Sequence, residues 1–200
     1  MPKRRTSPIG PEPNRPLREL VRMAEEDVAG KPVEHAIAYD AAGNEVLRKS
    51  GTANEIMLSR EEQRRIRGAV VVHNHPVKAW SNGAIIDNAP PSARDDLDIL
   101  ISCRLRELHV VTKDYLFLLM AKHDPRYSSS AERLKAIRQQ WTGTYNRFWR
   151  KRYDDLIAQY GKPLPSETEI AFFEECTEDA HAAWRAIAKK CRLIYRRQKR

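Results

Sequence analysis

The chain has 200 residues, of which 41% are hydrophobic and 32% are charged, and its net charge is +9. This length suffices for one domain with a hydrophobic core, and no stretch approaches the roughly 20 apolar residues of a membrane span. The amino terminus lacks the apolar segment of a secretory signal peptide, and the three cysteines are widely spaced without a C-x-x-C pair. The sequence therefore predicts a cytoplasmic protein with reduced thiols and no membrane partner.

The positive charge is concentrated at the two ends of the chain. Residues 1–16 carry a net +3 and residues 185–200 a net +8, so the residues between them sum to −2. Basic ends can bind nucleic acid or an acidic partner, and they are equally typical of solvated tails that keep a protein soluble. Because residues 1–16 contain five prolines and little that could pack, we expect them to be disordered.

The next segments predict an alternation of helices and strands. Apolar residues at helical spacing predict a helix over 17–29. Two strands are expected over 33–39 and 45–49, joined by a hairpin turn. Ser59-Arg-Glu-Glu62 is a capping box, which predicts a short helix that stops near Gly68.

A strand with two histidines follows, Val-Val-Val-His-Asn-His-Pro over 70–76. Because side chains alternate along a strand, His73 and His75 lie on the same side, and the proline ends the strand. After a loop, Asp95 lies in the first turn of a predicted helix and can reach back as a third ligand. Two histidines and one carboxylate leave the fourth position of a tetrahedral Zn²⁺ open for water, as in catalytic zinc sites.

The layout H-x-H-P followed by S-x-x-D resembles the JAB/JAMM (MPN-plus) metalloprotease family, and the stretch is most similar to its RadC-type branch. The resemblance covers about residues 31–120. It implies zinc-dependent hydrolysis of a peptide or isopeptide bond at the C-terminus of a ubiquitin-like protein or its conjugate. It also implies roles for particular residues: His73, His75 and Asp95 as zinc ligands, Ser92 as an oxyanion-holding group, and Glu34 as the general base.

Each part of this motif also has a simpler explanation. An H-x-H at a strand end occurs by chance, and Ser92-x-x-Asp95 is also an ordinary capping box. A glutamate on a strand is usually just solvated, and Glu45 and Glu55 are alternatives to Glu34 as the base. Residues 77–91 form a longer gap than the family has, which is read either as a flap over the substrate or as a segment packed on the edge of the domain.

The remaining elements complete the predicted sheet. A helix is expected over 92–105 and two strands over 108–112 and 115–119. The predicted fold class is α/β (α+β), a mixed β-sheet flanked by helices, in agreement with the JAB/MPN-like fold that the resemblance implies. We assign residues 17–125 to this metal domain.

Residues 126–200 are expected to form a helical extension with a basic C-terminus. Aromatic and apolar residues recur at three- and four-residue steps up to Tyr160, and a second helix, capped by Ser166, carries such a stripe to Cys191. These stripes are typical of core packing, whereas interleaved arginines leave open a nucleic-acid face: Arg147, Arg150 and Arg152. Two alternatives to the enzyme therefore remain, a RadC-like nucleic-acid-associated module and an inactive metal-binding scaffold.

Overall fold

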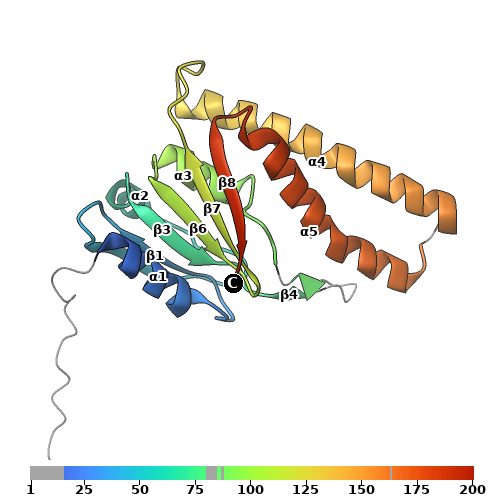
Figure 1. Cartoon of the computed structure of the whole chain (residues 1–200), viewed down its shortest axis with the longest axis horizontal. Helices are drawn as coiled ribbons and strands as arrows, with labels where there is room; N and C mark the ends of the chain where they lie inside the picture. Colours follow the sequence, from blue (N-terminus) through green and yellow to red (C-terminus); the bar gives the residue numbers. More distant parts are fainter. Residues whose placement is uncertain (1–15, 80–84, 87, 163) are drawn as a thin grey trace, which may run out of the picture.

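A computed structural model describes residues 16–79, 85–86, 88–162 and 164–200. Six strands form one mixed sheet with helices on both faces, and the strand order is β2-β1-β3-β6-β7-β8 (Figure 1). Only β3 and β6 pair in parallel among the strands of this sheet; the other neighbours are antiparallel. The strands are β1 (His35–Tyr39), β2 (Glu45–Ser50), β3 (Val70–Asn74), β6 (Glu107–Val111), β7 (Tyr115–Ala121) and β8 (Leu193–Lys199). The predicted mixed sheet flanked by helices is confirmed.

Five helices accompany the sheet: α1 (Leu17–Val28), α2 (Arg60–Arg65), α3 (Asp95–Ser102), α4 (Ser130–Tyr160) and α5 (Ser166–Ala188). The capping box that predicted α2 is present, because Ser59 Oγ accepts the N–H of Glu62 and the Glu62 carboxylate accepts the N–H of Ser59. The cap expected at Ser166 is wrong, since α5 already includes Ser166 and begins after Pro165. None of the helices in the described ranges is long and apolar enough to cross a bilayer.

The sheet separates two hydrophobic cores. Helix α1 packs its buried residues Val21, Ala24 and Val28 on one face of β1, β3 and β6. The opposite face packs against α3, the first turns of α4 and the last turns of α5, where Leu97, Ile137, Trp184 and others are fully buried. Strand β3 lies between β1 and β6 and is covered on both faces, so all five of its residues are buried.

The end of the chain differs from the expected basic tail. Leu193–Lys199 form β8, which pairs antiparallel with β7 along its whole length and is an edge strand of the sheet. The apolar residues Leu193 and Tyr195 pack against the α3–α5 core, which provides the reason for strand formation. A division into a metal domain (17–125) and a helical extension (126–200) is therefore incomplete, because both segments contribute to one sheet.

Helices α4 and α5 form an antiparallel hairpin that projects beyond the sheet (Figure 1). Aromatic rings join the two helices: Trp149 and Tyr153 of α4 stack on each other, and both contact Phe172 of α5 in edge-on and tilted geometry. Arg152 of α4 forms a two-pronged ion pair with Asp179 of α5. Most of the aromatic stripe of the sequence therefore serves packing, as expected, whereas Phe148 and Tyr160 of that stripe are exposed.

The gap between the second histidine and Ser92 contains a small hairpin of its own, β4 (Lys78–Ala79) and β5 (Ile85–Ile86). Residues 80–84 of the gap that was read as a flap or as a packed segment lie outside the described residues, as do residues 1–15 of the predicted N-terminal tail. The end of the segment is fixed to the β6–β7 turn, because Asn88 bonds to Thr112 and Asp114.

His109 on β6 ties α1 to the sheet. Its Nδ1 lies 2.7 Å from Glu25 Oε1 and its Nε2 lies 3.1 Å from Glu107 Oε2. Burial disfavours the charged imidazole, but the two carboxylates outweigh burial and hold the pKa of His109 above its ordinary value of 6.5.

This raised pKa predicts a pH-dependent contribution to stability. The stabilisation is fully present below the unfolded pKa of about 6.5 and is lost as the pH rises through the folded pKa. In urea unfolding, Glu25→Gln should lower the free energy of unfolding by about 1–3 kcal/mol near pH 6 and by much less near pH 9. The control is Glu26→Gln, which removes only an exposed pair with Arg22 on the same helix. An equal loss at both pH values would contradict a charged His109.

Candidate metal centre

The site is built at the carboxyl end of β3. His73 is on the strand, on the face that packs against α3, and its side chain is buried. His75 follows two residues later, and its N–H donates to Val111 O of β6 at 2.8 Å, which extends the pairing past the strand end. The buried strand thus fixes both imidazoles, in agreement with the alternation seen in the sequence.

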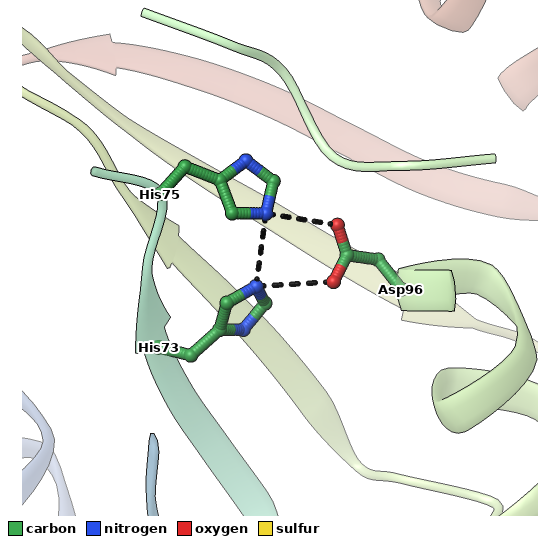
Figure 2. Close-up of side chains that lie close together, drawn as sticks. All are labelled: His73, His75 and Asp96. Carbon is green, nitrogen blue, oxygen red and sulfur yellow. Dashed lines mark hydrogen bonds and ion pairs between the residues drawn. The ribbon is translucent and has the colours of Figure 1, made fainter. Parts of the chain in front are cut away.

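Asp96, at the start of α3, completes a cluster with the two histidines (Figure 2). Its Oδ1 lies 3.0 Å from His73 Nε2 and its Oδ2 lies 3.3 Å from His75 Nε2. The two Nε2 atoms are 3.1 Å apart. Three potential ligand atoms therefore converge on one point: one from His73 on β3, one from His75 just after that strand, and one from Asp96 on α3.

These separations fit a single small ion. Bonds of about 2.0–2.2 Å to a tetrahedral Zn²⁺ place neighbouring ligand atoms about 3.4 Å apart, close to the 3.0–3.3 Å found here. Two imidazoles and a carboxylate suit Zn²⁺ and also other first-row divalent ions, such as Fe²⁺. The cluster can hold a metal ion with three protein ligands, and the donor set alone does not select zinc.

The surroundings fix the ring orientation of His75 and the charge of Asp96. His75 Nδ1 lies 3.0 Å from Ala89 O, and because a carbonyl only accepts, Nδ1 carries the proton and Nε2 faces the cluster. Burial disfavours ionised Asp96, but the charges of His73 and His75 outweigh it and hold the pKa of Asp96 far below its ordinary value. Burial also opposes protonation of His75, yet Asp96 holds its pKa above the ordinary value. The carboxylate is thus ionised at neutral pH.

Asp95, the expected third ligand, does not join the cluster. Its side chain is 83% exposed, and its nearest cation is Arg94 at 4.0 Å. Successive helical residues point about 100° apart, and the rotation of α3 that buries Leu97 and Leu100 turns Asp96 inward and leaves Asp95 in solvent. Asp96 shares the inward face with Leu97, Leu100 and Ile101. That apolar stripe was visible in the sequence, and extending it back by four residues from Leu100 would have selected Asp96.

Asn74, between the two histidines, was overlooked in the sequence. Its side chain is buried, accepts the N–H of His35 at 2.6 Å, and donates to the carbonyls of Lys31 and Val33. These bonds fix the segment that precedes β1. The middle residue of His-Asn-His thus positions the segment that carries Glu34.

Glu34 lies immediately before β1 and its side chain is buried. It lines one cavity of about 380 Å³ together with His73, His75 and Asp96. Its backbone exchanges two hydrogen bonds with Gly51 and Thr52, and Gly51 is required there because a Cβ would lie 2.0 Å from Glu55 O. The structure therefore brings Glu34 to the two histidines, as the proposed general base requires.

The two alternative glutamates differ in position. Glu45 pairs with Tyr39, at the opposite end of β1 from Glu34, and its carboxylate binds Arg48. Glu55 is exposed and lines the same cavity as Glu34. Glu55 therefore stays an alternative base and Glu45 does not.

Ser92 lines the cavity and organises the start of α3. Its Oγ accepts the N–H groups of Arg94 and Asp95, and its own N–H donates to Asp96 Oδ2 at 2.6 Å. Ser92 lies two residues before the N-cap residue Arg94, so the capping box suggested by its spacing is not formed, and it orients the inward carboxylate.

No protein-family model, no curated protein and no solved structure matches this chain. Inferences about function therefore start from the residues of the site.

The geometry predicts opposite outcomes for two neighbouring aspartates. Asp96→Asn should lower zinc affinity by more than about 100-fold, because it removes a ligand and not merely a residue that supports one. Asp95→Asn should keep the affinity of the original chain, since its side chain faces solvent. Metal content after dialysis and chelator competition would measure both, with circular dichroism to verify folding. If Asp95→Asn lost the metal and Asp96→Asn kept it, Asp95 would be the ligand.

Proposed function

We propose that the chain is a zinc-dependent peptidase or isopeptidase of the JAMM type. The observation that carries this proposal is the single cavity in which a buried glutamate, Glu34, meets the cluster of His73, His75 and Asp96. A metal cluster without a nearby base would suit a scaffold equally well. A buried carboxylate beside the cluster favours hydrolysis.

The residues divide the chemistry among them. A bound Zn²⁺ would polarise the scissile carbonyl and lower the pKa of a coordinated water to near neutrality. Glu34 accepts the proton of the attacking water and delivers it to the leaving amine. The Ser92 hydroxyl, on the cavity wall, donates to the oxyanion. His73, His75 and Asp96 supply the fixed ligand geometry.

The proposed substrate is the C-terminal tail of a ubiquitin-like protein or its conjugate. Support comes from the cavity wall, which combines Leu47 of the edge strand β2 with Ile56 and Leu58 of the following loop. An extended tail can lie beside such an edge strand. Met57 and Val77 are the most exposed large hydrophobic residues described, at 74% and 54%, and each is close in sequence to cavity residues. They suit contact with an apolar protein surface.

The general base gives the decisive test of this function. Glu34→Gln keeps the size of the side chain but cannot accept a proton, so cleavage of ubiquitin-like fusions should fall by about 10²–10⁴-fold. Zinc content should be unchanged, because Glu34 is not a ligand. The matched control is Glu55→Gln, from the rim of the same cavity, which should keep nearly full activity.

Two outcomes would contradict the assignment. An inactive Glu55→Gln together with an active Glu34→Gln would make Glu55 the base. Absence of cleavage by the zinc-loaded original chain across ubiquitin-like and plain peptide substrates would favour the inactive scaffold.

A second function, nucleic-acid binding, is favoured by the charges around β8. The segment 189–200 contains seven basic residues and no acid. Six of them are exposed and have no ion-pair partner among the described residues: Lys189, Lys190, Arg192, Arg196, Lys199 and Arg200. Because β8 is part of the sheet, its cations are held at fixed spacing, which suits a phosphate backbone better than a disordered tail does.

This surface predicts a salt-dependent affinity. Replacing Lys189, Arg196 and Lys199 by Gln should weaken binding of a labelled DNA duplex and reduce the salt slope by about 0.9 for each phosphate that the variant no longer neutralises. The control replaces Arg147 and Arg150, exposed cations of α4, by Gln. If only the control weakened binding, the nucleic-acid face would be on α4, and unchanged binding in both would exclude either surface.

A further inference from the structure

The α4–α5 hairpin contacts the segment that leads into the metal ligand Asp96. Trp184 of α5 is fully buried and donates its Nε1–H to Pro91 O at 2.8 Å. Arg138 of α4 donates Nη2–H to Arg94 O at 2.7 Å and Nε–H to Ala93 O at 3.4 Å. Side chains from two helices thus donate hydrogen bonds to three of the four backbone carbonyls of residues 91–94.

Ala93 also packs against the hydrophobic core, but few other polar contacts connect this segment to distant described residues. The remaining hydrogen bonds of residues 90–94 are local: they join Ser92 to residues 94–97, and the N–H of Asp98 to Arg94 O. Helix α3 itself begins without a side-chain cap from its N-cap residue, Arg94. The long-range hydrogen bonds of residues 90–94 to other described residues all come from Trp184 and Arg138.

Asp96 is only two residues beyond Arg94, so the position of its carboxylate depends on the path of this segment. Metal centres tolerate little displacement, because ligand distances are set within about 0.2 Å. The hairpin also has its own firm attachment to the sheet, through the buried Ile137 and Trp184 and through β8. Through its hydrogen bonds to residues 91–94, the hairpin can therefore hold Asp96 at a fixed position relative to the sheet.

We propose that Trp184 and Arg138 are positioning residues of the metal centre, and that the α4–α5 hairpin holds Asp96 against the two histidines. This inference rests on the proposed metal site, and it assigns to the helical segment a role in that site beyond packing. Neither residue touches the ligand atoms; both act through the backbone carbonyls of Pro91, Ala93 and Arg94.

Trp184→Phe and Arg138→Met test this role, with metal affinity as the readout. Trp184→Phe keeps an aromatic ring but removes the N–H donor, and Arg138→Met keeps a long apolar chain without donors. Zinc affinity should fall by about 10–100-fold in each, the loss typical of residues that support metal ligands. The visible spectrum of the Co²⁺-substituted protein should change as well, because it reports ligand geometry.

Matched controls separate positioning from general destabilisation. Ile187→Val opens a small cavity in the same core, three residues from Trp184, and Arg147→Met removes an exposed arginine of α4. Both should leave zinc affinity and the Co²⁺ spectrum unchanged. Thermal unfolding of all four variants would show how much stability each substitution removes.

The outcomes distinguish this inference from the proposed function. If the original chain binds zinc and both Trp184→Phe and Arg138→Met bind it equally well, the hairpin has only a structural role and the inference is wrong. If Ile187→Val loses zinc affinity in proportion to stability, as Trp184→Phe does, positioning is also refuted. Failure of the original chain to bind zinc or cobalt would instead overturn the metal centre itself.

Discussion

The burial of Asp96 beside His73 and His75 is the constraint on which the site depends. An ionised carboxylate in a protein interior is costly unless cations or hydrogen-bond donors compensate it. Here two imidazoles and the Ser92 N–H surround the carboxylate, and they keep it ionised. A divalent cation at the same point would replace the imidazole protons as the compensating charge, with the carboxylate and two deprotonated imidazole nitrogens as its ligands.

This arrangement requires several segments that are distant in sequence to meet at one strand end. Asn74 fixes the segment before β1, which carries Glu34. Ala89 O binds His75, and Asn88 connects the same loop to the β6–β7 turn. Because these contacts join each segment to a distant part of the chain, each segment is held at a defined position around the cavity. The hydrogen bonds of Trp184 and Arg138 extend this support to the α4–α5 hairpin.

The C-terminal segment shows how one stretch of sequence can serve two purposes. Leu193 and Tyr195 face the core and place β8 at the edge of the sheet, while Arg196 and Lys199 remain exposed. Charged residues on an edge strand oppose pairing with another sheet, and this explains some of the positive charge without any ligand. The exposed cations that precede the strand, from Lys189 onward, are not needed for that protection.

The sequence by itself determined the local elements and two of the three clustered ligands. Strand alternation placed His73 and His75 on one side, and the capping box at Ser59 located α2, because both patterns depend on neighbouring residues alone. The choice between Asp95 and Asp96 depended on the rotation of α3 about its axis, which the packing of Leu97 and Leu100 sets. The position of Glu34 depended on the long-range bonds of Asn74. Strand β8 was hidden because a basic segment pairs with β7 only once the hairpin has returned the chain to the sheet. Contacts between distant residues therefore decided which side chains share the cavity.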